Sequence, residues 1–168
     1  NYDKFPNPAK FIERFNSEKI HLIPNIKPAF LTSHPMYNEI VEKGLFVKNE
    51  DGTPFVTEFW DGMGSYIDFT LPEGFKFWHD NVAAKLLDYG IDATWNDNNE
   101  FDIKDTDAVA NGFKDGSVKA SRIRPILTYL MVASSYSAQT EKYPGKRPFL
   151  STRSGSSAVR RLATTWSG

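Results

Sequence analysis

The chain has 168 residues, enough for one ordinary domain. Its 20 Lys and Arg residues balance 21 Asp and Glu residues without a long run of either sign, which argues against nucleic acid and against an anionic membrane surface as partners. The lack of cysteine excludes disulfides and thiolate metal sites, and no apolar run approaches the roughly 20 residues of a membrane span.

The start of the chain has no features of a signal peptide, and Asn1 is not an initiator methionine. We therefore expect a piece of a longer protein. Its localisation, cytoplasmic or secreted, stays unknown at this point.

The first predicted elements are a helix and a strand. Asn7 followed by Pro8 is typical of an N-cap and the first helical position, which predicts a helix that ends near Ser17. Residues 20–26 favour a strand, which Pro28 stops.

A short helix and a hairpin follow. Residues 35–44 have a proline at the start, an apolar face and a glycine at the end, which predicts a helix. Residues 45–47 and 55–59 are short apolar runs on either side of an Asp-Gly turn at residues 49–52. This pattern predicts a β-hairpin and not a strand of the main sheet.

The strongest helix prediction is for the stretch that begins at residues 70–73 and ends at Gly90. Thr70 and Glu73 have the spacing of a capping box, in which each side chain satisfies a backbone donor of the other. Trp78 and Val82 lie on one apolar face, and Gly90 is the expected stop.

The second half of the chain alternates between strands and helices. Residues 101–119 read as a long loop with one helical turn, and the other predicted elements are a strand at 91–95, a helix at 125–140, a strand at 148–152, a short helix at 156–161 and a strand at 162–166. Such alternation predicts right-handed crossovers and a parallel sheet.

Three motifs occur in order along the chain. They are Phe-Trp-Asp-Gly at residues 59–62, Trp-Asn-Asp-Asn-Asn-Glu at 95–100, and a last stretch at 147–168 that begins Arg-Pro-Phe-Leu-Ser-Thr-Arg-Ser-Gly and ends Thr-Trp-Ser-Gly. Together they resemble glycoside hydrolase family 31, the group of α-glucosidases, α-xylosidases and α-galactosidases. The resemblance covers essentially the whole chain.

The resemblance implies an α/β fold. It is that of a partial TIM (β/α)8 barrel, approximately barrel strands 3 to 6 with a β-hairpin excursion. A complete barrel typically needs roughly 250 residues. We therefore expect residues 1–168 to be a single incomplete catalytic-domain fragment that requires the rest of the barrel.

Two carboxylates follow the strand predicted at residues 91–95, at the end of a strand where α/β enzymes place their chemistry. By residue type alone, a plain Asp- and Asn-rich loop is the alternative. The resemblance implies that Asp97 is the catalytic nucleophile and that Glu100 supports the active-site loop without acting as the acid. Asn98 departs from the family, in which many members carry an apolar residue directly after the nucleophile.

Three tryptophans and one arginine match positions that line the sugar pocket of the family. The tryptophans are Trp60, Trp95 and Trp166, with core packing as the alternative role. Arg153 matches an arginine that reaches the sugar hydroxyls or the nearby carboxylates, a task that suits a guanidinium fork. Asp68 is expected to help hold the loop that carries Trp60.

The function implied by the resemblance is that of a retaining α-glycosidase, similar to α-glucosidases. It would release terminal α-linked sugars from oligosaccharides through a glycosyl-aspartate intermediate. Its partner would be the carbohydrate substrate, and no metal or organic cofactor is needed. In the family, the aspartate that acts as general acid and base follows Trp-Ser-Gly directly, so we expect it after Gly168.

Two alternatives stay open. One is transglycosylation within the same family, which differs only in the acceptor of the sugar. The other is a non-catalytic, sugar-binding barrel remnant. An aspartate directly after Gly168 would favour the enzyme, and any other residue there would favour the remnant.

Overall fold

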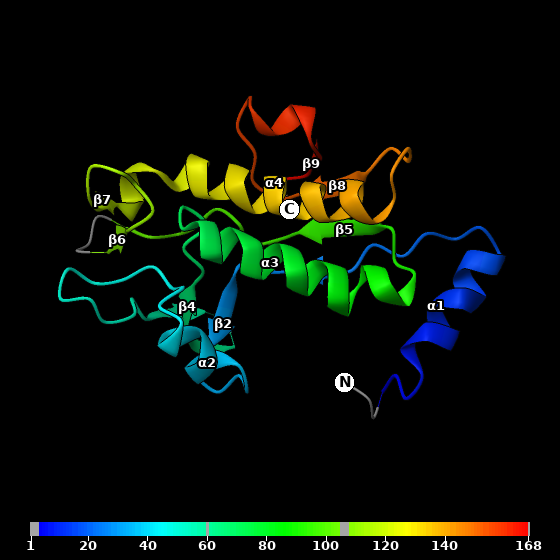
Figure 1. Cartoon of the computed structure of the whole chain (residues 1–168), viewed down its shortest axis with the longest axis horizontal. Helices are drawn as coiled ribbons and strands as arrows, with labels where there is room; N and C mark the ends of the chain where they lie inside the picture. Colours follow the sequence, from blue (N-terminus) through cyan, green and yellow to red (C-terminus); the bar gives the residue numbers. More distant parts are fainter. Residues whose placement is uncertain (1–3, 60, 105–107, 168) are drawn as a thin grey trace.

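The computed structural model describes residues 4–59, 61–104 and 108–167 (Figure 1). Its helices are α1 (Pro8–Ser17), α2 (Tyr37–Glu42), α3 (Pro72–Lys85) and α4 (Arg124–Lys142), with short 3-10 turns at Leu87–Tyr89, Ala120–Arg122 and Val159–Arg161. Its strands are β1 (Asn25–Ile26), β2 (Ala29–Leu31), β3 (Thr57–Phe59), β4 (Gly62–Tyr66), β5 (Ala93–Asn96), β6 (Val109–Ala110), β7 (Val118–Lys119), β8 (Phe149–Thr152) and β9 (Thr164–Thr165).

The main sheet is parallel and open. Its four strands lie in the order β1-β5-β8-β9, and each neighbouring pair is parallel. Helices α3 and α4 lie side by side, and α4 packs on β5 and β8 (Figure 1). This confirms the predicted α/β class and agrees with part of a barrel, while the numbering of the strands as 3 to 6 stays a prediction.

Local signals placed the first and third helices correctly. The side chain of Asn7 accepts a hydrogen bond of 3.0 Å from the backbone N–H of Lys10, and Pro8 is the first residue of α1. The apolar face of α3 buries Trp78 and Val82. Gly90, with φ of 94°, ends the short turn that continues α3.

The strand predicted at residues 20–26 is much shorter in the structure, where β1 is only Asn25–Ile26. The carbonyl of Pro24 still accepts from the N–H of Trp95 at 3.0 Å. Proline has no N–H to donate in return, so the ladder stops there. The strand predicted at residues 162–166 is likewise reduced to β9.

The predicted capping box is wrong. The first residue of α3 is Pro72, and its N-cap, Leu71, makes no side-chain cap. The hydroxyl of Thr70 instead donates to Asp68 Oδ1 at 2.5 Å and accepts from the N–H of Gly112 at 2.9 Å. The Thr70 hydroxyl thus bonds to the loop at Gly112 and not to the backbone at the start of α3.

Small antiparallel elements lie outside the parallel sheet. The predicted turn at residues 49–52 is present, and the N–H of Phe55 donates to the carbonyl of Val47. Strands β2 and β3 flank β4. From the sequence, no strand is predicted at the position of β4. The loop predicted at residues 101–119 contains the β6–β7 pair, and its described residues, 101–104 and 108–119, form no helical turn. Val109 in this loop exchanges hydrogen bonds with Lys48.

Buried polar side chains fix the central strand to the helices. Trp78 Nε1 on α3 donates to Ser135 Oγ on α4, and Ser135 donates in turn to Asn96 Oδ1 at the end of β5. Gln139 on α4 donates to Thr94 on β5. Because side chains alternate along a strand, the other face of β5 carries Trp95. None of the described helices is long and apolar enough to cross a membrane.

Candidate active site

All four strands of the parallel sheet end at the same level. Their last residues are paired in one row across the sheet: Ile26, Asn96, Thr152 and Thr165. The residues that follow them along the chain are Lys27, Asp97, Arg153 and Trp166. Backbone bonds continue between three of these residues and the neighbouring strands, because the N–H groups of Asp97, Arg153 and Trp166 donate to the carbonyls of Ile26, Asn96 and Thr152. We call these four following residues the end row.

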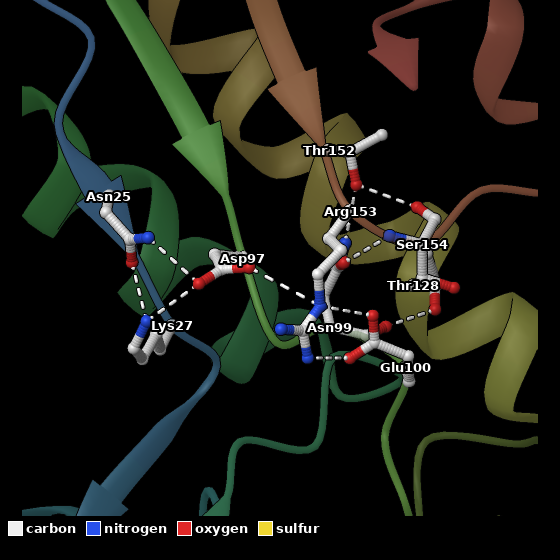
Figure 2. Close-up of polar contacts among 9 residues, drawn as sticks. All are labelled: Asn25, Lys27, Asp97, Asn99, Glu100, Thr128, Thr152, Arg153 and Ser154. Carbon is white, nitrogen blue, oxygen red and sulfur yellow. Dashed lines mark hydrogen bonds and ion pairs between the residues drawn. The ribbon is translucent and has the colours of Figure 1, made fainter. Parts of the chain in front are cut away.

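Asp97 lies in the middle of the end row, between Lys27 and Arg153 (Figure 2). Only 6% of the residue is exposed. Its Oδ2 accepts from Lys27 Nζ at 2.8 Å and from Asn25 Nδ2 at 2.9 Å. Its Oδ1 lies 3.5 Å from Arg153 Nε. The carboxylate is therefore held from the side of β1 and faces a guanidinium on the side of β8.

These contacts decide the charge of Asp97. Burial acts to raise its pKa, but the hydrogen bonds from Lys27 and Asn25 outweigh burial and hold the pKa below the usual value. The group is thus an anion at neutral pH. An ionised carboxylate at the end of a parallel strand can act as a nucleophile or stabilise a cation.

Arg153 makes its main contact with Glu100. Its Nε and Nη2 donate to the two oxygens of Glu100 at 2.7 and 2.8 Å, a paired fork (Figure 2). These bonds lower the pKa of Glu100 and raise that of Arg153. Glu100 is therefore an ionised acceptor and is poorly suited to give a proton to a leaving group.

Asn99 fixes the loop that follows Asp97. Its Nδ2 donates to Thr152 Oγ1 at 2.8 Å, its Oδ1 accepts from the N–H of Ser154 at 3.0 Å, and its carbonyl accepts from Thr128 (Figure 2). The neighbouring Asn98 has φ of 51°, a left-handed conformation that asparagine tolerates better than most residues. The two asparagines thus let the chain turn sharply directly after the central carboxylate.

Unpaired polar atoms mark the same stretch. Within the described residues, the buried side-chain nitrogen and oxygen atoms without a hydrogen-bond partner are Trp95 Nε1, Asn96 Nδ2, Asp97 Oδ1 and Asn98 Oδ1. Folded proteins leave few buried polar groups unpaired, and those that occur call for an explanation. Asn96 faces Ser135 on α4, whereas Trp95 lies on the other face of β5. The unpaired oxygen relevant to chemistry is therefore Asp97 Oδ1, at the end of the strand.

The predicted aromatic residues are partly brought together. The rings of Trp95 and Trp166 meet edge to face with centroids 4.8 Å apart, and 43% of Trp166 is exposed. Trp60 lies outside the described residues. Asp68 is fully buried and bonds to Thr70 and Asn111, so its contacts lie away from Asp97 and its predicted support of the Trp60 loop stays a prediction.

Two cavities flank the Arg153–Glu100 pair. One, of about 560 Å³, is lined also by Arg124, Thr128 and Ser154, and the other, of about 610 Å³, is lined also by Phe59, Tyr66 and Asn98. Burial raises the pKa of Tyr66 to about 12, so the phenol is neutral and can donate a hydrogen bond. Among the described residues, no group of three His, Asp or Glu side chains is placed to hold a metal ion.

Sequence reasoning missed Asn25, Lys27 and Asn99. Asn25 and Lys27 belong to a segment that was read only as a strand stopped by Pro28. Their position in the sheet could have identified them, because polar side chains at the carboxyl end of one parallel strand lie beside those at the end of the neighbouring strand. Using that signal requires knowing that β1 pairs with β5.

Comparison with known proteins places the chain in a family. A model of the glycosyl hydrolases family 31 TIM-barrel domain matches residues 1–168. The α-glucosidase 2 of Bacillus thermoamyloliquefaciens is 29% identical over 99% of this chain, which spans 22% of that relative's length.

Solved structures agree on the fold. A family 31 sulfoquinovosidase from E. rectale matches 97% of this chain with a TM-score of 0.84 and 23% identity, and the match covers 24% of that protein. A family 31 dextranase from Flavobacterium johnsoniae matches 96% with a TM-score of 0.83 and 20% identity, over 20% of its length. The chain therefore belongs to glycosyl hydrolase family 31 and carries part of its TIM-barrel domain.

Proposed function

We propose that this chain is the part of a retaining α-glycosidase that carries the catalytic nucleophile, Asp97. The observation that carries the proposal is the state of Asp97: buried, ionised, held on Oδ2 and unpaired on Oδ1, at the carboxyl edge of a parallel sheet. The α-glucosidases among the relatives of the chain support α-linked glucosides as the first substrates to test.

In the proposed reaction, a lone pair of Asp97 Oδ1 attacks the anomeric carbon of the terminal sugar. The bond from that carbon to the glycosidic oxygen breaks, and the leaving oxygen takes a proton from a general acid. Water then attacks the glycosyl-aspartate, gives a proton to the same group and releases the sugar with its original configuration. Oδ1 suits the attack because no described residue hydrogen-bonds to it.

The acid is proposed to be the residue after Gly168. Trp166 belongs to the end row. Its backbone N–H donates to the carbonyl of Thr152, and its ring packs on that of Trp95. The chain beyond Trp166 therefore leaves the sheet at the edge that carries Asp97. The fork with Arg153 argues against Glu100 in this role.

The pocket walls come from the same row. Trp95 and Trp166 offer aromatic surface on which a pyranose ring can stack. Arg153 lines both cavities and carries fixed donors for sugar hydroxyls. We propose that residues 1–168 act within a single barrel domain, and that the remaining strands complete the pocket.

Two other functions are compatible with this site. Transglycosylation needs the same nucleophile and differs in the acceptor, so product analysis separates it from hydrolysis. A non-catalytic sugar-binding remnant can use the same ionised carboxylate, whose Oδ1 would accept a hydrogen bond from a sugar hydroxyl. Release of the aglycone from a glycoside separates the enzyme from such a remnant.

The test is a screen of aryl α- and β-glycosides with the complete gene product. We expect release from α-glycosides only, with proton NMR showing the α-anomer as the first sugar product. An Asp97→Ala variant should be inactive, and added azide should restore some turnover and give a β-glycosyl azide. Inversion of configuration, or undiminished activity in Asp97→Ala, would overturn the proposal.

A further inference from the structure

Lys27 and Asn25 form a closed triangle with Asp97. Lys27 Nζ donates to Asp97 Oδ2 at 2.8 Å and to Asn25 Oδ1 at 2.8 Å, and Asn25 Nδ2 donates to the same Asp97 Oδ2 at 2.9 Å (Figure 2). Neither residue belongs to the motifs by which the family was identified. Both lie at the end of β1, the neighbour of β5 in the sheet.

We propose that Lys27, oriented by Asn25, is a positioning residue that keeps the Asp97 carboxylate ionised and turned so that Oδ1 faces the pocket. This inference rests on the proposed function, because it assigns a task to Lys27 only if Asp97 attacks the sugar. It goes beyond that function by naming the cation on which the nucleophile depends.

The distribution of charge around Asp97 supports Lys27 over Arg153 for this task. The guanidinium of Arg153 uses Nε and Nη2 on Glu100 and approaches Asp97 only to 3.5 Å. Glu100 itself is an anion near Asp97 and offsets much of the charge of Arg153. Across a small hollow lies another carboxylate, Asp61, which lines it together with Lys27. Among the described residues, Lys27 is thus the cation that donates a hydrogen bond to Asp97.

The triangle also fixes geometry. Two donors on Oδ2 hold one oxygen of the carboxylate toward β1, which leaves the other without a hydrogen bond and directed toward Arg153. A carboxylate with one oxygen clamped loses rotational freedom before the substrate binds, and such preorganisation lowers the barrier to attack. The Lys27 side chain is 36% exposed, so its replacement leaves no large hole in the core.

The expected pH effect follows from the sign of the interaction. A cation in contact lowers the pKa of Asp97, so the nucleophile stays ionised to lower pH. Replacing Lys27 with a neutral residue removes that cation and raises the pKa. Reactions that need ionised Asp97 should then lose rate at a higher pH than in the wild type.

The experiment measures how fast a fluorinated α-glycosyl fluoride labels Asp97 in the complete gene product, as a function of pH. This reaction reports the attack step alone. In Lys27→Met, we expect the acidic limb of the labelling rate to move up by about 1 to 2 pH units. Lys27→Arg should restore the wild-type position, and Asn25→Ala should give a smaller shift in the same direction.

Lys76→Met is the matched control, because Lys76 pairs with Asp80 at 2.7 Å on the exposed side of α3, far along the chain from the site. It should label like the wild type. If Lys27→Met proves unfolded by circular dichroism, Lys27→Gln and Asn25→Ala decide the question in its place. Profiles of the folded variants that superimpose on the wild type would overturn the inference.

The two proposals fail in different ways. If the wild-type protein is not labelled on Asp97 at all, the proposed function is wrong. If Asp97 is labelled but its pH profile does not depend on Lys27 or Asn25, only the positioning role is wrong.

Discussion

Among the described residues, two aspartates are buried, and their surroundings differ in kind. Asp68 is fully buried and accepts from Thr70 N, Thr70 Oγ1 and Asn111 N at 3.0, 2.5 and 2.7 Å. Burial raises its pKa. Asp97 is almost as buried, yet its pKa is lowered, a lysine contacts it, and one of its oxygens has no hydrogen bond among the described residues.

The difference separates a structural carboxylate from a reactive one. Oδ1 of Asp68 accepts from Thr70 and Oδ2 accepts from the N–H of Asn111, so both of its oxygens are hydrogen-bonded within the chain. Asp97 is hydrogen-bonded on Oδ2 only, and its Oδ1 faces Arg153, a residue that lines two cavities. Buried charge with one open side is typical of functional sites.

Asp97→Asn should have the largest effect. The oxygen of the amide can still accept from Lys27 and Asn25, so the fold should keep its melting temperature. The side chain has lost its charge and most of its nucleophilicity, and turnover of the complete gene product should fall by several orders of magnitude. The exposed Asp115→Asn is the control, and near-normal turnover in Asp97→Asn would contradict the account.

The same comparison applies to two tryptophans, Trp78 in the core and Trp95 at the proposed active site. Trp78 packs in the core and donates to Ser135, so Trp78→Ala should destabilise the protein by about 3–5 kcal/mol. Trp95→Ala, at the site, should weaken turnover far more than folding. Thermal unfolding and activity per folded molecule separate the two effects. If the melting temperature of Trp95→Ala collapses while its activity persists, Trp95 is a core residue.

Asp68→Asn should lower the stability of the fold and keep the activity, the reverse of what we expect for Asp97→Asn. Whichever way the amide is turned, its NH₂ group faces a backbone N–H, that of Thr70 or that of Asn111. A buried donor without an acceptor costs about 2 kcal/mol, so the unfolding transition should move to lower temperature. Activity per folded molecule should stay near that of the wild type, and a specific loss of activity would place Asp68 in the site after all.

Arg153→Lys should have the smallest effect of the four. A lysine keeps the charge but cannot form the fork that holds both oxygens of Glu100. The loss of one charged hydrogen bond corresponds to roughly a tenfold decrease in kcat/KM. The exposed Arg160→Lys serves as the control. An unchanged kcat/KM would mean that the fork has no part in catalysis.

Local chemistry made much of the fold predictable. Asn7 and Pro8 begin α1, and Gly90 ends the turn after α3, because caps and positive φ angles depend on a few adjacent residues. The short β6–β7 pair was not predictable, since Val109 is held by Lys48, far away in the sequence. The Thr70 cap was predicted wrongly because its hydroxyl donates to the neighbouring Asp68 and accepts from Gly112, which is far away in the sequence.

The site was predictable only in part. Asp97 and Arg153 belong to the motifs at residues 95–100 and 147–168, and the structure places both in the end row. Lys27 carries no motif, and its contact with Asp97 depends on the register of β1 against β5, which no local pattern encodes. Asn99 lies within a motif, but the sequence of an Asn-rich loop does not show which asparagine bonds to the neighbouring strand and its loop.

The most direct test of the central claim is to find the atom that carries the sugar. The complete gene product is treated with a fluorinated α-glycosyl fluoride, digested with trypsin and fragmented in a mass spectrometer. Cleavage after Lys85 and Lys104 puts Asp97 and Glu100 in one peptide, so fragmentation must separate them. The account predicts the mass of the sugar on Asp97. A label on Glu100, or on any other residue, would contradict it.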